Sequence, residues 1–286
     1  MKEFKDKVAV ITGAASGIGR GIAQRCTQEG MKVVLADIEE KALAQTEKEM
    51  KAAGASVLAV RTDVSRASDV EALGQKALDA FGLVHLLCNN AGVGAGGSIW
   101  ESTLADWEWV IGVNLWGVIH GVRVFVPIML EQDTECHIVN TASGVGLISS
   151  PHLGIYKVTK HGIVTLSETL YHELALRGAK IKVSVLCPVW VNTQLMEVER
   201  NRPAELRNDP AEEVRIRMSP EYQEAERLVR EAVQAGISCQ QVADCLFNAI
   251  REKKFYILTD PELVKPAVQM RMEDILQERN PTNPLP

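Results

Sequence analysis

The chain has 286 residues, of which 46% are hydrophobic and 24% are charged, and its formal net charge at pH 7 is −6. This is ordinary globular composition, and the acidic balance argues against a general nucleic-acid binder, which usually carries a basic patch. We expect no apolar run long enough to span a bilayer and no signal sequence, and therefore a soluble, cytoplasmic protein.

Short apolar runs alternate with amphipathic stretches along the chain. The apolar runs predict strands at residues 7–13, 32–37, 56–60, 84–92, 136–143, 180–188 and 254–258. The stretches between them predict helices at residues 17–29, 39–53, 65–81, 103–131, 155–177, 238–251 and 262–279, with Ser65 as the cap of the third. Several strands are continuously apolar, which is typical of parallel strands covered on both faces. With right-handed crossovers, this predicts a single α/β domain over 1–286, a doubly wound Rossmann-type sheet of about seven strands with helices on both faces.

The stretch that follows Thr193 differs in composition. Residues 195–236 are highly charged, with scattered Met, Leu and Val. Charged runs usually form a solvated surface. This one follows the sixth strand at the carboxyl edge of the sheet, so a substrate lid over 195–236 is the alternative. Residues 262–286 are expected to form a C-terminal helical extension with an irregular tail.

The six cysteines predict neither disulfides nor a metal site. They show no CxxC pair and no His partner at metal-ligand spacing. We therefore expect reduced structural thiols and no metal, which also disfavours a metal-dependent dehydrogenase.

The segment "TGAASGIG" (12–19) follows a predicted strand and opens a predicted helix, which is the context that a phosphate-binding glycine loop requires. Gly13 allows a tight turn, Gly17 lets the backbone approach a pyrophosphate, and Gly19 allows close helix–strand packing. The helix N-terminus adds free N–H groups and a positive dipole end.

Asp37 ends the second predicted strand. At this place a carboxylate is suited to accept hydrogen bonds from ribose hydroxyls, although it could instead cap the next helix. Together, the glycine loop and Asp37 favour the binding of a dinucleotide.

Tyr156 and Lys160 lie four residues apart on a predicted helix, and Ser143 lies upstream. Side chains at this spacing share one face, about 5–6 Å apart at Cβ. Taken alone, such a pair is common on helix surfaces, and a Ser after a strand is also common.

The combination is specific. The pattern TGxxxGIG, the segment "NNAG" (89–92), and Ser143, Tyr156 and Lys160 occur in the order of the short-chain dehydrogenase/reductase family, and the chain resembles its single-domain branch over about residues 5–195. The resemblance implies cofactor contacts from Gly13, Ser16, Gly17, Ile18, Gly19, Asp37, Ile38, Asp63, Val64, Asn90, Ala91, Gly92, Tyr156, Lys160, Val191 and Thr193.

The predicted cofactor is NAD(H) rather than NADP(H). Ser16 stands where phosphate-preferring relatives often have Arg or Lys, and the Asp37 carboxylate would repel a 2′-phosphate with no cation to offset it. The resemblance further implies a homotetramer or homodimer, with helices 103–131 and 155–177 at the interface.

The resemblance implies an enzyme that interconverts a secondary alcohol and a ketone. A free phenol has a pKa of about 10, so Tyr156 needs help to act as the acid/base near neutral pH. Lys160 and a positively charged nicotinamide would favour the phenolate, and Ser143 would hold the substrate oxygen. Lys160 would also bind the nicotinamide ribose, and Asn114 would complete a water relay.

The substrate itself is not predicted beyond an apolar small molecule, possible examples being bulky or cyclic alcohols. Residues that flank the motifs suggest the pocket: Val145, His152, Leu153, Trp190, Leu195 and Met196. Val189 stands where the family commonly has Gly, and it and Trp190 would narrow this pocket. The alternative function is a non-catalytic NAD(H)-binding sensor or scaffold on the same fold.

Overall fold

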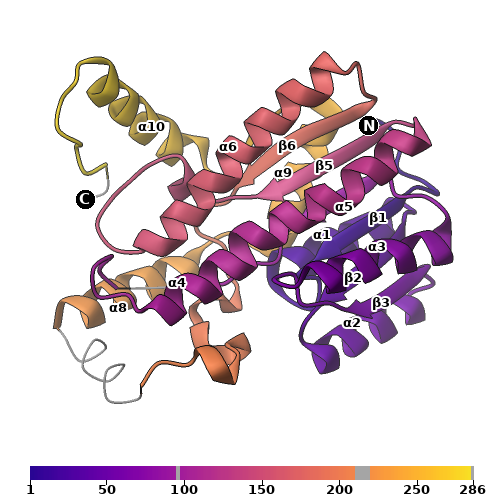
Figure 1. Cartoon of the computed structure of the whole chain (residues 1–286), viewed down its shortest axis with the longest axis horizontal. Coiled ribbons are helices and arrows are strands. Elements are labelled where there is room, and N and C mark those ends of the chain that lie inside the picture. Colours follow the sequence, from indigo (N-terminus) through magenta and orange to yellow (C-terminus); the bar gives the residue numbers. More distant parts are fainter. Residues whose placement is uncertain (95–96, 210–219, 285–286) are drawn as a thin grey trace.

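A parallel sheet forms the centre of the fold (Figure 1). The computed structural model describes residues 1–94, 97–209 and 220–284. Within these residues seven strands pair in the order β3-β2-β1-β4-β5-β6-β7, all in parallel. They are β1 (Val8–Thr12), β2 (Lys32–Asp37), β3 (Val57–Arg61), β4 (Leu86–Asn89), β5 (Cys136–Thr141), β6 (Ile181–Cys187) and β7 (Tyr256–Leu258). The predicted doubly wound sheet is confirmed.

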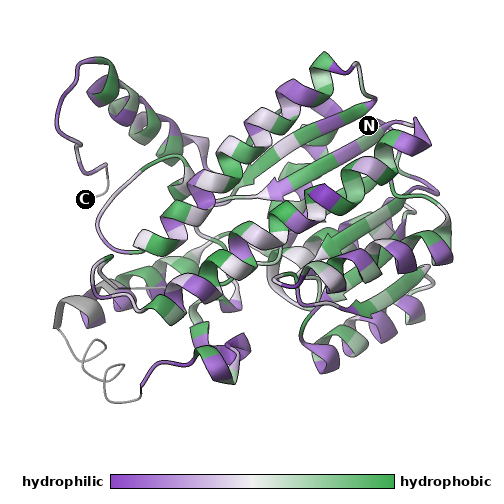
Figure 2. Ribbon diagram, viewed as in Figure 1, coloured by the Kyte–Doolittle hydropathy of each residue, from purple (hydrophilic) through white to green (hydrophobic). Residues whose placement is uncertain are grey.

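Helices cover both faces of the sheet. One face packs against α1 (Gly17–Gln28), α2 (Glu40–Ala52) and α9 (Cys239–Glu252), and the other packs against α3 (Ala67–Phe81), α5 (Gly117–Gln132) and α6 (Gly154–Leu176). Successive residues of β1 divide between the two sides, with Ile11 in one core cluster and Val10 in the other. This division follows from the two-residue period of a strand. It explains why the strands are largely apolar, as the green colour over much of their length in Figure 2 shows.

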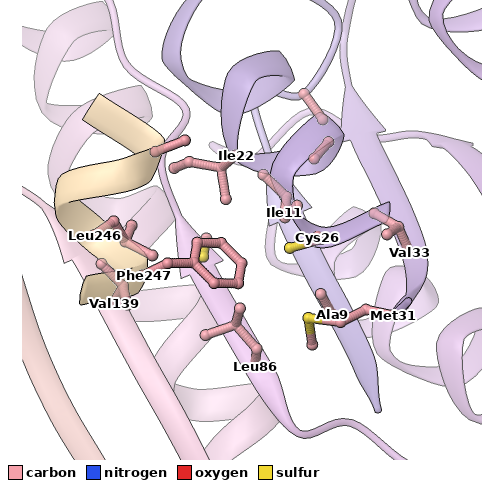
Figure 3. Packing of buried hydrophobic residues seen from close by; sticks show 14 of the residues in the cluster. Ala9, Ile11, Ile22, Cys26, Met31, Val33, Leu86, Val139, Leu246 and Phe247 are labelled. Atoms are coloured by element: carbon pink, nitrogen blue, oxygen red, sulfur yellow. The ribbon is translucent and has the colours of Figure 1, made fainter. Parts of the chain in front are cut away.

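The core on the α1 and α9 side is built from large, fully buried side chains. Figure 3 shows Phe247 of α9 and Ile22 of α1 lying over Ile11 and Leu86 of the sheet. Burying each such side chain contributes about 1.5–3 kcal/mol. The strands are thereby held from both faces, and their carboxyl ends are left for the site.

The predicted helix 103–131 contains a π-helical turn that was not predicted from its sequence. It consists of α4 (Leu104–Ile111), a π-helical turn (Gly112–Trp116) and α5, with right-handed helical backbone at both junctions. Single π turns inside α-helices occur frequently at functional sites. Here the turn carries Asn114.

The same continuous helix, Leu104–Gln132, is long and apolar enough to cross a membrane by length and composition alone. The expectation that no stretch reaches that length is therefore wrong. Trp109, Val110, Phe125 and Met129 of this helix are buried against other elements of the protein. A core helix of a globular protein meets the same criterion, because one of its faces must cover the sheet.

Some predicted boundaries shift. The fourth strand ends at Asn89 rather than at residue 92, because the chain leaves the sheet there to line the cleft described below. The proposed cap of α3 is also wrong. Arg66 is the N-cap residue, and the Ser65 hydroxyl donates instead to Asp63 Oδ1 at 2.6 Å.

The segment after β6 is only partly regular. It has three 3₁₀ turns (Gln194–Met196, Val198–Asn201, Ala204–Leu206) and then α8 (Pro220–Ala235). The predicted role of 195–236 as a lid stays a prediction, and residues 210–219 lie outside the described residues. The last helix, α10 (Pro261–Leu276), begins just after β7 and extends away from the β3 edge (Figure 1).

A buried chain of polar side chains crosses the sheet. Asn89 Nδ2 donates to Asn140 Oδ1 at 2.9 Å, and Asn140 Nδ2 donates to the Ser167 hydroxyl at 3.0 Å. Gly121 of α5 packs on this chain so closely that a Cβ there would lie 2.0 Å from Asn89 Oδ1. The approach of α5 to β4 thus requires glycine at this position.

Gly121→Ala is therefore expected to lower the free energy of unfolding by about 1–3 kcal/mol, because the helix must move away or Asn89 must give up its hydrogen bond. Urea unfolding followed by circular dichroism measures this. Gly112→Ala on the same helix is the control, since its Cβ would meet Ser65 at an ordinary 3.5 Å. Equal stability of the two variants would contradict the packing argument.

Candidate active site

A cleft opens at the carboxyl ends of the strands, beside the neighbouring strands β1 and β4. The order of the sheet reverses at this point, because β1 leads towards β2 and β3 on one side while β4 leads towards β7 on the other. Open α/β sheets bind ligands at such a switch point. Most of the predicted site residues line this cleft: Gly13, Ser16, Gly17, Ile18, Asp37, Ile38, Asp63, Val64, Asn90, Ala91, Gly92, Ser143, Tyr156, Lys160, Val191, Thr193 and Leu195.

Thr12 holds the two central strand ends together. Its hydroxyl oxygen accepts hydrogen bonds from the backbone N–H of Asn90 at 2.9 Å and of Ala91 at 3.0 Å. The Asn90 amide donates in return to the Thr12 carbonyl at 3.0 Å. The loop after β4 is therefore fixed against the start of the glycine loop.

The glycine loop has the shape that close approach to phosphate requires. Gly13 and Gly17 have φ angles of +66° and +55°, a left-handed region that favours glycine. A Cβ at Gly19 would lie 2.1 Å from the Gly13 carbonyl oxygen. The N-terminus of α1 follows directly, so its free N–H groups and dipole favour an anion such as a pyrophosphate here. The residues thus fit a bound dinucleotide.

Asp37 lines the cleft beside the glycine loop. Its carboxylate accepts from the backbone N–H of Ala15 at 2.9 Å and of Glu39 at 3.0 Å. Burial raises the pKa of Asp37, and these N–H donors oppose the shift. The carboxylate therefore braces the glycine loop and still lines the cleft.

Helix α6 brings Tyr156 and Lys160 to the opposite end of the cleft. The Lys160 ammonium is buried, donates to the Thr141 carbonyl at 3.0 Å and lies 5.3 Å from the centre of the Tyr156 ring. A Cβ at Gly146 would come within 2.8 Å of the Lys160 carbonyl, so the turn after β5 packs directly on the helix.

Burial changes the acidity of both groups in opposite directions. It raises the pKa of Tyr156 to about 12, against the effect of a hydrogen bond with the Ser143 side chain. It lowers the pKa of Lys160 to about 8. At pH 7 the phenol is therefore protonated, and the ammonium beside it is still charged.

Ser143 is the third polar group at this end. Its hydroxyl donates to the Pro188 carbonyl at 3.3 Å, and the residue is buried. Val189, which stands where the family commonly has Gly, also lines the cleft, and its Cγ2 lies 3.1 Å from where a Cβ of Gly144 would be. Its side chain therefore packs against Gly144, the residue after Ser143.

Asn114 lies behind this group and does not line the cleft. Its amide accepts from the Val93 N–H at 2.8 Å and donates to the Val93 carbonyl at 3.0 Å and the Thr159 hydroxyl at 3.2 Å. A Cβ at Gly92 would lie between Asn114 Oδ1 (3.3 Å) and Lys160 Nζ (3.5 Å). The π turn thus ties the loop after β4 to the helix that carries Tyr156.

Several predicted pocket residues lie elsewhere. Among the residues that line the cleft, Val145, His152, Leu153, Trp190 and Met196 are absent, and Met196 faces a neighbouring cavity instead. His152 is exposed, with a left-handed φ of +59°. Val189, which was expected to narrow the pocket, does line the cleft, and four further apolar residues that the flanking-motif argument missed line it too: Val93, Trp109, Val113 and Val198. Val113 lies in a largely apolar stretch, whereas Val198 is surrounded by charged residues, so no common pattern identifies the wall.

One premise of the cofactor prediction is wrong. The sequence suggested that no cation lies near Ser16, but the Arg200 guanidinium lines the cleft and donates to the Ser16 hydroxyl at 3.5 Å. It also pairs with Glu39 at 2.8 Å. Arg200 lies in a charged run far along the chain, and nothing in that run distinguished it.

The turn that carries Arg200 is anchored at its other end. Arg202 is buried, pairs with Asp106 at 2.7 Å, and stacks on Trp109 with its guanidinium 5.2 Å from the ring centre. Burial would raise the pKa of Asp106, but hydrogen bonds from the Thr103 backbone, Asn208 and Arg202, together with the charge on Arg202, lower it below its ordinary value. The segment from Gln194 to Leu206 is thereby fixed to α4.

The cysteines and acidic side chains form neither a disulfide nor a metal-ligand cluster within residues 1–94, 97–209 and 220–284. All six cysteines are free thiols, four of them buried. In the part of the chain that the structure describes, no three His, Cys, Asp or Glu residues lie close enough to hold a metal ion.

Comparison with known proteins gives consistent results. The family model for short chain dehydrogenase matches residues 7–204. A "CLA biosynthesis dehydrogenase/reductase" from Lactiplantibacillus plantarum is 36% identical over 281 residues, 98% of this chain and 97% of the relative. A diacetyl reductase [(S)-acetoin forming] from Staphylococcus epidermidis is 36% identical over 191 residues, 67% of this chain and 74% of its own length. The crystal structure of a short chain dehydrogenase/reductase from Burkholderia phymatum in complex with NAD is 52% identical, covers 100% of both chains and has a TM-score of 0.94.

Proposed function

The chain belongs to the short-chain dehydrogenase/reductase family, and from this we propose that it is an NAD-dependent oxidoreductase that interconverts a secondary alcohol and a ketone. The observation that carries the proposal is that Ser143, Tyr156 and Lys160 line the same cleft as the glycine loop and Asp37. A cleft with an anion-binding loop at one end and a phenol beside an ammonium at the other suits a dinucleotide and a hydroxyl-bearing substrate.

The residues at the adenosine end would hold the cofactor. The glycine loop and the α1 N-terminus would take the pyrophosphate, Asp37 would accept from the adenosine ribose, and Lys160 would bind the nicotinamide ribose. When bound, NAD would supply the hydride acceptor for alcohol oxidation.

The chain's own residues would handle the proton. We propose that the Ser143 hydroxyl donates to the substrate oxygen and holds it beside the Tyr156 hydroxyl, which takes up the alcohol proton or returns one to a ketone. The raised pKa of Tyr156 keeps its proton available for reduction at neutral pH. For oxidation, the charge on Lys160 favours the phenolate. Asn114 would position this group through Val93 and Thr159 and contribute to a water relay.

The substrate end of the cleft favours apolar molecules. Its wall includes Trp109, Val189 and Leu195. An apolar wall with a few convergent polar groups is typical of small-molecule sites. We propose a small apolar alcohol or ketone as the substrate. The name of the diacetyl reductase relative also indicates a small ketone as the substrate of that protein.

Tyr156→Phe should reduce turnover by about 10²–10⁴-fold, the usual effect of losing a general base, while NAD binding changes little.

Lys160→Ala should weaken NAD binding and move the rising limb of the pH–rate profile of alcohol oxidation to higher pH. The wild-type Lys160 ammonium has a pKa of about 8, so it is charged at neutral pH and loses its proton at higher pH. Lys160→Arg should restore little of the activity that Lys160→Ala loses, because a planar guanidinium does not replace a compact ammonium.

The decisive measurement is the pH–rate profile of alcohol oxidation for the three variants, with a screen of secondary alcohols read at 340 nm. If Tyr156→Phe keeps near wild-type turnover, the phenol only packs and the base lies elsewhere. A protein that binds NAD but turns over no alcohol or ketone would instead favour a sensor or scaffold.

We propose that NAD(H) is preferred over NADP(H). Asp37 is buried at the adenosine end and is braced by backbone donors, so its carboxylate cannot move away from a 2′-phosphate without releasing the glycine loop. Isothermal titration with both cofactors should give tighter binding for NAD. Equal or tighter binding of NADP would refute the preference.

We propose a cytoplasmic homodimer or homotetramer in which α4, α5 and α6 form the interface. Large apolar side chains are exposed on these helices, such as Leu104 at 87% and Leu176 at 89%, and on the π turn between α4 and α5, where Trp116 is 48% exposed. Light scattering at micromolar concentration should give a multiple of the 31.4 kDa chain mass. A monomeric mass would contradict this assembly.

A further inference from the structure

We propose that the ion pair between Arg200 and Glu39 sets how strongly the enzyme discriminates between NAD and NADP. This inference rests on the proposed function, since it concerns the cofactor that the cleft would hold. The two residues come from segments 161 positions apart and meet over the end of the cleft that Asp37 and Ser16 line.

The contact is built from several hydrogen bonds. Arg200 Nη2 lies 2.8 Å from Glu39 Oε1 and 3.5 Å from the Ser16 hydroxyl, and Nη1 bonds the Gln194 side chain. Asn201 Nδ2 donates to the same Glu39 oxygen at 2.9 Å. The guanidinium is therefore held by a turn on one side and by the loop after β2 on the other.

The position of the guanidinium is also fixed from behind. Arg202, two residues further on, is anchored to Asp106 and Trp109 of α4. Arg200 and Glu39 themselves are only partly covered, with exposed side-chain fractions of 29% and 25%. The pair therefore borders solvent while its backbone stays in place, so a substitution of either side chain leaves the turn supported.

The charges of Asp37, Glu39 and Arg200 explain why the cleft would bind NAD in preference to NADP. A 2′-phosphate carries about −1.5 to −2 charges at pH 7. Asp37 and Glu39 both repel it, and Arg200 can attract it only if its guanidinium is not already shared with Glu39. While the ion pair holds, the corner stays net negative and rejects NADP. Without the Glu39 charge, the same guanidinium becomes a phosphate ligand of the kind that Arg forms well.

Isothermal titration of NAD and NADP to four proteins tests this: wild type, Glu39→Gln, Arg200→Met and the double variant. Removing one adjacent charge should raise the NADP affinity of Glu39→Gln relative to NAD by about tenfold. Arg200→Met should show no gain, and the double variant should lose the gain of Glu39→Gln. Gln keeps the shape of Glu39, whose side chain does not cap α2.

Two controls remove equal charges nearby. Glu40→Gln changes an exposed residue next to Glu39, and Arg207→Met changes an exposed residue on the same segment as Arg200. Both should leave the ratio of the two affinities near wild type.

The outcomes separate the inference from the proposed function. If the gain of Glu39→Gln persists in the double variant, or if Glu40→Gln matches it, the ion pair does not set the discrimination and the inference is overturned. Wild-type protein that binds neither dinucleotide overturns the proposed function and this inference with it. Wild-type protein that binds NAD, with affinity ratios that do not change among the variants, overturns the inference alone.

Discussion

The hydrogen bonds that join Thr12 to Asn90 and Ala91 are the constraint on which the site depends. At this place the crossovers of the sheet diverge, and β1 and β4 end side by side. One side of the junction continues into the glycine loop, and the other continues through Gly92 to Asn114 and Lys160. A single hydroxyl thus sets the spacing between the glycine loop and the group around Tyr156.

The two ends are stabilised by different kinds of interaction. The glycine loop is shaped by backbone geometry, because it needs left-handed φ angles and has no space for a Cβ at Gly19. The Tyr156 end is shaped by burial, which moves the pKa of Lys160 down and that of Tyr156 up. Burying an ammonium is costly unless it is hydrogen-bonded, and the Thr141 carbonyl meets that need. The position of Lys160 therefore follows from β5 as much as from α6.

Local patterns predicted the sheet, its helices and the residues of the cleft floor, because strand ends in a parallel sheet share one edge. Contacts between segments that are distant in sequence could not be read in the same way. The π turn at Asn114 has no signal in an apolar helix, and the chain from Asn89 through Asn140 to Ser167 appears only when β4, β5 and α6 are side by side. Arg200 and Arg202 belong to one charged run, yet Arg200 lines the cleft and Arg202 is buried against α4. Charge alone did not separate them.

The segment between Gln194 and Leu206 borders both halves of the cleft. Leu195 and Val198 contribute to its apolar wall, while Arg200 and Asn201 contact Glu39 in the loop after β2. Arg202 fixes the segment to α4 through its ion pair with Asp106. A change that enlarges the wall for a new substrate would therefore also displace Arg200 and Asn201 beside the loop after β2. In directed evolution, substrate range and coenzyme choice should change together in this protein rather than as independent traits. Libraries that vary this segment need selection for both.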